Sequence, residues 1–167
     1  VNKLATLAKV NPSAFASYKN KKRSIAISGN GTHSFTVSDV NIKGAGFLFV
    51  CDDLVGTHRM NASNTTSGGW EGCEMRSWLG STMLNNFPSD LRSVIKAVSN
   101  QNTSGYGAAT TSDKLWIPSF TEVGLQSGSA EGAKFSIFTN DSSRIRKNGS
   151  SAAVWWLRSV ISSSDFR

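Results

Sequence analysis

The stretch Gly69–Val98, GWEGCEMRSWLGSTMLNNFPSDLRSVIKAV, carries the clearest periodic pattern in the chain. In its first half, apolar residues recur at spacings of three and four, at Met75, Trp78, Leu79, Met83 and Phe87. That spacing places them on one side of an α-helix. The pattern therefore predicts an amphipathic helix with one buried face, which Pro88 ends.

A second, shorter helix is predicted directly after Pro88. Ser89 is expected to act as its N-cap, and Asp90 in the first turn suits the positive end of the helix dipole. Apolar residues then follow at i, i+3, i+4 and i+7, at Leu91, Val94, Ile95 and Val98. The stretch thus indicates two amphipathic helices joined by a tight link.

The segment before this helix pair has the pattern of β-strands. SIAIS and HSFTVSDV alternate apolar and polar residues and are separated by Gly29-Asn30-Gly31, which predicts a hairpin. GFLFV, residues 46–50, is continuously apolar, so we expect a strand covered on both faces. Residues 52–69 are polar and predict a loop.

After the helix pair, residues 99–112 have loop composition, and two strands are predicted beyond them. Leu115 and Ile117 alternate with polar or aromatic neighbours, and Ser119 to Glu122 forms a capping-box pattern that opens a helical turn. AVWWLRSV, residues 153–160, is the second strand, with its two tryptophans on opposite faces. We expect one shared interior that contains the three tryptophans Trp78, Trp116 and Trp156.

The 167 residues suit one folded domain with a short appended arm. The net charge is +7, yet residues 1–38 contain six basic groups and no acid, so residues 39–167 are almost neutral. A basic arm can contact nucleic acid or an anionic surface, but a solvated terminus without a nucleic-acid partner is the favoured interpretation. No apolar run is long enough for membrane insertion. The first residues lack the pattern of a signal peptide, and a start at valine suggests a fragment of a longer protein.

Motifs of common enzymes do not occur in the sequence. Asp52, Asp53 and His58 suggest a metal or acid/base site, but adjacent carboxylates on an extended chain point to opposite faces, so loop hydrogen bonds are favoured. Cys51 and Cys73 are expected to be small buried apolar residues, and a single bridge between them stays an open alternative. We therefore predict neither an enzyme nor a bound cofactor or metal.

With four sequence motifs taken together, the chain resembles an uncharacterised domain family of bacterial surface proteins and phage tail or fibre proteins. The motifs are GGW-x-x-C-x-M-R-x-W-L (68–79), a Pro-x-x-L helix, T-S-D-K-L-W-I-P-S-x-x-E (111–122) and W-W-L-R-S (155–159). The resemblance implies an α+β, C-type lectin-like fold with two helices on small, mostly antiparallel sheets and long loops. Residues 1–24 would be a basic arm or linker, and residues 25–167 the domain, without the last strands that members usually carry.

The resemblance also implies a function. We expect a non-enzymatic adhesion module of a virion or bacterial surface that presents its loops to a host glycan or protein, as a homo-oligomer or part of a larger assembly. A structural assembly domain is the alternative. The expected ligand-binding residues are the exposed cations and an outward tryptophan, namely Arg144, Arg146, Lys147 and Trp155. Arg158, beside the predicted core, is expected to have an internal partner.

Overall fold

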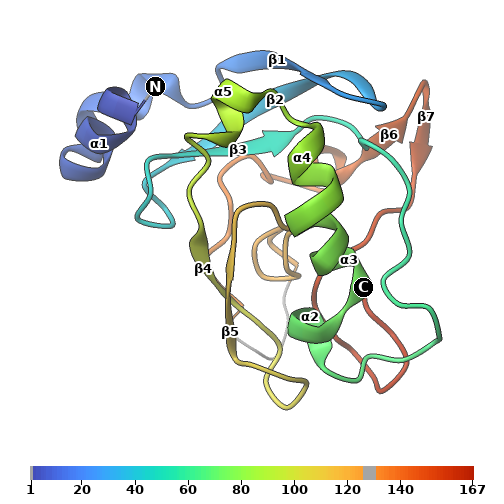
Figure 1. The fold of residues 1–167 in the computed structure, drawn as a ribbon. Coiled ribbons are helices and arrows are strands. Elements are labelled where there is room, and N and C mark those ends of the chain that lie inside the picture. The colour runs from blue at the N-terminus through green and yellow to red at the C-terminus, as the bar shows by residue number, and fades with distance from the viewer. Residues whose placement is uncertain (1, 126–130) are drawn as a thin grey trace.

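Small antiparallel sheets and a few helices build a mixed α and β fold, and Figure 1 shows their arrangement. The computed structural model describes residues 2–125 and 131–167. The helical elements are α1 (Asn2–Val10), η1 (Pro12–Tyr18), α2 (Gly69–Gly72), α3 (Glu74–Trp78), η2 (Leu79–Met83), α4 (Leu84–Asn86), α5 (Ser89–Arg92) and η3 (Ser142–Arg144). The strands are β1 (Lys22–Ile27), β2 (Gly31–Val40), β3 (Phe47–Cys51), β4 (Val98–Gln101), β5 (Thr110–Asp113), β6 (Arg146–Asn148) and β7 (Ser151–Ala153).

The first predicted helix is confirmed, with an irregularity in its middle. Elements α3, η2 and α4 follow one another without a break, and η2 is a π-helical turn. The predicted inner face is buried at Met75, Met83 and Phe87. Trp78 and Leu79 are partly buried and pack on two apolar clusters, so this helix links them.

The second predicted helix is wrong in its length and in its cap. Element α5 ends at Arg92, and Pro88 occupies the N-cap position that we expected for Ser89. Val98 belongs to β4, where it pairs with Asp113. β-Branched residues such as valine lose side-chain rotamers in a helix and pack well in a strand. Pairing with β5 therefore decides the structure at Val98, although the apolar spacing is helical.

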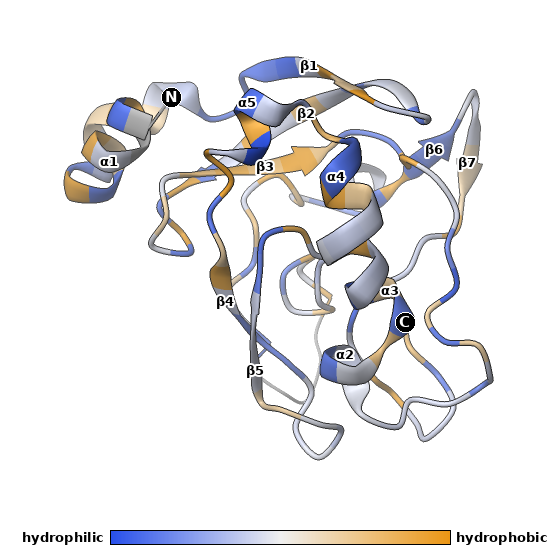
Figure 2. Cartoon of the chain, in the orientation of Figure 1, coloured by the Kyte–Doolittle hydropathy of each residue, from blue (hydrophilic) through white to orange (hydrophobic). Residues whose placement is uncertain are grey.

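The predicted hairpin is confirmed, but the burial of its sheet differs from the expectation. The sheet has the order β1-β2-β3 with antiparallel pairing, and the β2–β3 register shifts between Val37 and Asp39. The middle strand β2 is buried on both faces over residues 35–39. Strand β3 is an edge strand whose Phe49 is exposed, although Figure 2 shows its strongly apolar composition. The expectation that β3 is covered on both faces is therefore wrong.

Residues 98–113 form a hairpin where a polar loop was expected, because β4 pairs with β5 antiparallel. In contrast, residues 115–118 are not a strand. The carbonyl of Ile117 accepts a hydrogen bond from the Arg158 side chain, and that of Pro118 accepts one from the Arg158 backbone. Backbone groups that a sheet would pair are thus satisfied by one arginine.

The tryptophan-rich segment near the end also differs from its prediction. Only Ser151–Ala153 is a strand, and beyond it Val160 forms an isolated bridge with Phe166. Trp156 is 45% exposed, whereas Trp155 is partly buried and packs on a core cluster. The expected meeting of Trp78, Trp116 and Trp156 therefore fails for Trp156. Trp116 does contact two clusters, one of them also contacted by Trp78.

A buried polar network holds distant segments together. Arg158 and Glu122 are fully buried, and the guanidinium donates to the Glu122 carboxylate, which also pairs with Lys43. This confirms that Arg158 has an internal partner. The predicted capping box is confirmed as well, since Ser119 and Glu122 exchange hydrogen bonds of 3.0 and 3.1 Å.

The same network holds a second buried carboxylate, Glu131. It accepts hydrogen bonds from the hydroxyls of Thr103 and Ser159. Each hydroxyl oxygen also accepts a backbone N–H, from Val160 and Phe120 respectively. Because each oxygen already has that donor, its own proton is directed to the carboxylate.

The segment from Asn2 onward is folded. Residues 1–24 contain α1, η1 and the start of β1, so the expected boundary between arm and domain falls inside a strand. Figure 1 shows α1 projecting at one side of the molecule, beyond the three-stranded sheet.

Candidate functional site

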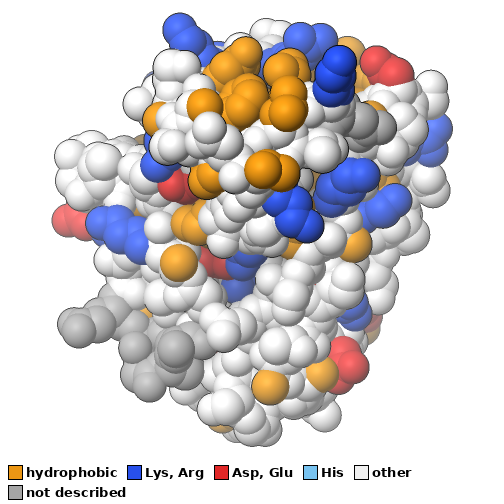
Figure 3. Space-filling view, turned by 90° about the vertical axis from the view of Figure 1, so that its left-hand side faces the viewer, with side chains coloured by type: hydrophobic (Ala, Val, Ile, Leu, Met, Phe, Trp, Pro, Cys, Tyr) orange, Lys and Arg blue, Asp and Glu red, His pale blue; other side chains and the backbone are white. Residues whose placement is uncertain are grey.

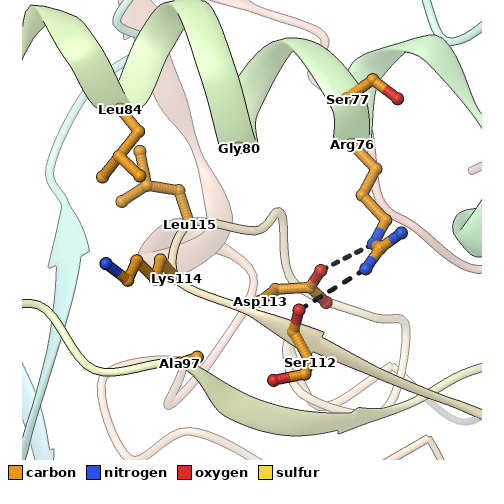
Figure 4. A pocket seen from close by; sticks show the side chains of 9 residues that line it. All are labelled: Arg76, Ser77, Gly80, Leu84, Ala97, Ser112, Asp113, Lys114 and Leu115. Atoms are coloured by element: carbon orange, nitrogen blue, oxygen red, sulfur yellow. Dashed lines mark hydrogen bonds and ion pairs between the residues drawn. The ribbon is translucent and has the colours of Figure 1, made fainter.

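A groove of about 280 Å³ lies between the broken helix and the strand β5. Figure 4 shows Arg76 and Leu84 reaching from the helix toward Asp113 and Leu115 of the facing segment, whereas the Ser77 hydroxyl points away from that segment. The helix supplies Arg76, Ser77, Gly80 and Leu84, and the facing segment supplies Ala97, Ser112, Asp113, Lys114 and Leu115. The pair of Arg76 and Asp113 lies with Ser112 at one end of the groove, and the side chains of Leu84, Leu115 and Lys114 lie at the other.

An ion pair fixes the polar end. Arg76 Nε donates to Asp113 Oδ1 at 2.6 Å, and the guanidinium also donates to the carbonyls of Glu71 and Ser112. The other carboxylate oxygen of Asp113 accepts hydrogen bonds from Trp70, Asn100 and Thr111. The pair therefore joins the helix rigidly to the hairpin.

These contacts also set the protonation state of Asp113. Burial by itself would raise the pKa of this carboxyl group, but four hydrogen-bonding side chains outweigh it and hold the pKa below its usual value. Asp113 is therefore ionised at neutral pH. Because its oxygens are already occupied by donors, it is unsuited to act as a general base.

Other polar groups in the groove are available to a ligand. Within residues 2–125 and 131–167, the side chains of Lys114, Ser77 and Ser112 make no hydrogen bond or ion pair. The guanidinium of Arg76 has five N–H groups, of which its three hydrogen bonds use three. The groove thus offers two cationic groups and the hydroxyl of Ser112.

The π-helical turn shapes the groove wall. Gly80 lies in this turn, and a Cβ atom built on it meets no atom within 4 Å. Turns of this type widen a helix locally and often occur at functional sites. A side chain at position 80 would therefore occupy open space in the groove.

The family of the chain is decided by a match over residues 45–167 to the family described as Domain of unknown function (DUF6273). The chain belongs to this family. No curated protein and no solved structure matches the chain significantly. The DUF6273 region contains the groove and the buried residues Glu122, Glu131 and Arg158, whereas β1 and β2 precede it.

The binding residues expected from the sequence lie elsewhere in this DUF6273 chain, and most of them face inward. Arg144 donates to the carbonyls of Val123 and Gly124. Arg146 is buried and lies 5.0 Å from the centre of the Phe138 ring. Trp155 stacks on Phe138 as well, so it is not the outward tryptophan that we expected. Of the four predicted binding residues, only Lys147 is exposed.

The acidic residues considered for a metal site are used in local hydrogen bonds. Asp52 accepts from Ser34, Thr36 and Lys22, and Asp53 accepts from the backbone N–H of Lys147. In the described parts of the chain, no three His, Cys, Asp or Glu side chains come together as a metal site requires.

The cysteines are also far from a redox arrangement. Cys51 packs with the cluster around Phe35, and Cys73 with the cluster around Trp70. Both thiols are free, so the alternative of a bridge between them is wrong for this structure.

Sequence reasoning missed the groove, although several of its residues, Arg76 and Asp113 among them, stand inside the quoted motifs. Arg76 and Asp113 are charged residues in motifs that are otherwise rich in apolar and small residues. A charged pair in two such motifs is a signal for a contact between them. The contact between Arg76 and Asp113 depends on β5, which carries Asp113. Because residues 99–112 have loop composition, the sequence did not indicate this strand.

Proposed function

We propose that this DUF6273 chain is a non-enzymatic binding module with a C-type lectin-like fold, part of a phage tail or bacterial surface protein. It binds a host surface glycan in the groove between the broken helix and β5. One observation carries this proposal. The groove contains polar groups without a partner in the described chain, Lys114 first among them, and also the ion pair of Arg76 and Asp113.

The chemistry of the groove favours an acidic oligosaccharide. Sugar hydroxyls can bond to Ser112 and the spare N–H groups of Arg76. Because Asp113 already neutralises Arg76, the uncompensated charge is that of Lys114, which suits a carboxylate on the sugar. The apolar faces of the sugar rings can pack on Leu84 and Leu115.

The arrangement of elements supports the lectin-like part of the proposal. Helices pack on small antiparallel sheets, and long irregular segments run over residues 52–68 and 114–125. The buried network of Arg158, Glu122 and Glu131 anchors the second of these segments. Loops on a rigid frame are the usual means by which a scaffold carries binding residues.

The groove also supports a binding role over a catalytic one. Among the described residues that line it, Asp113 is the only carboxylate, and it accepts four side-chain hydrogen bonds. General acid/base catalysis needs a titratable group with access to the substrate proton, and Asp113 lacks that access.

A binding assay on immobilised neutral and uronic-acid-containing oligosaccharides tests the proposal. We expect a preference for the acidic sugars, weakened about tenfold by Lys114→Ala. Gly80→Met should abolish binding without unfolding the chain, because position 80 faces open space.

Lys147→Ala is the matched control for the assay, since it removes an exposed lysine from the loop first predicted to bind. It should bind as the unaltered chain does. If Lys147→Ala loses binding while Lys114→Ala and Gly80→Met keep it, or if no sugar binds, the proposed groove site is refuted.

A second candidate function, structural assembly, is favoured by a different observation. The antiparallel register of β6 and β7 pairs Arg146 with Ala153, so Ile145 and Val154 lie next to each other one residue further along. Both side chains are exposed, as is Trp156. An apolar group at the end of a two-stranded ribbon suits contact with another subunit.

Analytical ultracentrifugation distinguishes the two candidates. An assembly domain would self-associate, and Val154→Ser would weaken that association. A monomer that binds acidic sugars supports the binding module instead.

A further inference from the structure

The helix α1 presents an apolar ridge to solvent. Leu4, Leu7 and Val10 follow one another at spacings of three along the helix and are 42%, 47% and 80% exposed. Such spacing keeps side chains on adjoining parts of one helix side. An aliphatic side chain gains free energy when it leaves water, so this ridge is suited to contact with an apolar phase or partner.

The ridge is held on the body of the protein. Ala8, one helical turn after Leu4, is completely buried, and Asn41 donates to the carbonyl of Lys9 at 3.3 Å. After α1, the η1 residues Phe15 and Tyr18 pack their rings against Phe47 of β3. The helix therefore projects in a defined direction and is not a loose tail.

The N-terminal segment that carries the ridge is basic and contains no acidic residue. Residues 1–38 contain six Lys and Arg and no Asp or Glu. Two of these cations pair with the body, Lys19 with Asp39 and Lys22 with Asp52. The other four are exposed and have no ion-pair partner among the described residues, namely Lys3, Lys9, Lys21 and Arg23.

The figures show this combination directly. In Figure 2 apolar and polar residues alternate around α1. Figure 3 views the molecule from the side on which α1 projects, and hydrophobic side chains gather in its upper part with Lys and Arg beside them. This face of the molecule is thus both apolar and cationic.

We infer that α1 docks on an anionic lipid surface, with the ridge of Leu4, Leu7 and Val10 in the interface and the four free cations at the headgroups. A basic amphipathic helix binds membranes in this manner. Lysine stems can lie along the apolar boundary while their ammonium groups reach the headgroups, so Lys3 beside the ridge is compatible with it. The contact is interfacial, and no described helix has the length and apolar character of a membrane span.

Two observations favour lipid over an acidic protein as the occupant. Protein interfaces are fixed in register by complementary charges of both signs, whereas residues 1–38 carry a single sign. Protein interfaces also depend on aromatic or arginine anchors, and the ridge on α1 is purely aliphatic. A lipid surface needs neither charges of both signs nor such anchors. Its fluid headgroups adapt to the shape of the ridge, and their negative charge attracts lysine and arginine at any position along the surface.

Sedimentation with lipid vesicles tests the inference. We expect the full chain to bind phosphatidylglycerol vesicles and to leave phosphatidylcholine vesicles unbound. High salt should weaken this binding, because the attraction is largely electrostatic. Replacing both Leu4 and Leu7 by serine should weaken it at least about tenfold. Each lysine should contribute about fivefold to the affinity for these vesicles. Replacing both Lys3 and Lys9 by glutamine should therefore also weaken vesicle binding by more than about tenfold.

Ile161→Ser is the matched control, since it removes an equally exposed aliphatic side chain elsewhere on the molecule. It should bind as the unaltered chain does, and circular dichroism checks that all variants remain folded. Equal binding to both vesicle types refutes the inference. So does an unchanged affinity of the leucine variant, or capture of α1 by an acidic protein without any vesicle binding.

Discussion

The guanidinium of Arg158 donates to the carboxylate of Glu122 while both side chains are shielded from solvent. The same arginine bonds to the backbone carbonyls of Ile117, Gln101 and Glu131. It therefore joins four segments of the chain that lack a common sheet. These contacts are the role of the arginine of W-W-L-R-S in this structure.

Arg158→Met should strongly destabilise the fold. The change leaves Lys43 as the one charged partner of Glu122 and removes the arginine donors from the carbonyls of Ile117, Gln101 and Glu131. Breaking a buried pair in this way typically costs about 3 kcal/mol or more. Urea unfolding measures the loss. The control is Arg59→Met, whose ion pair with Glu74 is largely exposed and should contribute far less. Equal losses for the two variants would contradict the role given to Arg158.

Gly69→Ala should also destabilise the fold, because a Cβ atom there would lie 1.6 Å from the carbonyl oxygen of Tyr106 at a φ of +54°. We expect a loss of about 2 kcal/mol or more. The matched change Gly80→Ala meets open space inside a helix and should raise the free energy of unfolding by about 0.5–1 kcal/mol. Thermal unfolding of both variants checks the pair. A tolerated Gly69→Ala would show that this close approach is absent.

The lowered pKa of Asp113 makes part of the stability depend on pH. A carboxyl group whose folded pKa lies below its unfolded value stabilises the fold above the unfolded value, and this contribution is lost as the pH falls through the folded pKa. Asp113→Asn should therefore be less stable than the unaltered chain at neutral pH. The difference should shrink below about pH 4. Unfolding free energies measured at several pH values check this, and a constant difference would contradict it.

Neither cysteine should react in the folded protein. Burial raises the pKa of the Cys51 thiol to about 11, with the nearby carboxylates of Asp52 and Asp53 acting in the same direction. Cys73 is fully buried, and burial raises its pKa as well. Since the thiolate is the reactive form, a thiol reagent should label both residues only after unfolding. Rapid labelling of the folded chain would contradict the burial of these thiols.

The parts of the fold that the sequence predicted are those with local causes. The helix around Met75 and Met83 follows from apolar spacing, and the β1–β2 hairpin follows from alternation around a glycine-rich turn. The capping box of Ser119 and Glu122 is equally local. In each of these cases, neighbouring residues decide the structure.

The predictions fail where residues far apart in the sequence determine the local structure. Val98 leaves its helical pattern because Asp113 is available as a strand partner. Residues 115–118 have the composition of a strand, but Arg158 satisfies their carbonyls. Arg144 and Arg146 are cations in a polar stretch, yet carbonyl groups and the Phe138 ring hold them inside. Composition alone could not reveal these long-range contacts.

A titration of the ¹⁵N-labelled chain with a uronic-acid oligosaccharide, followed by NMR, tests the proposed groove site most directly. The amide signals of Ser77, Gly80 and Lys114 should shift together and saturate, while that of Lys147 stays unchanged. Shifts confined to residues 144–147, or no saturable shift at the groove, would contradict the proposal.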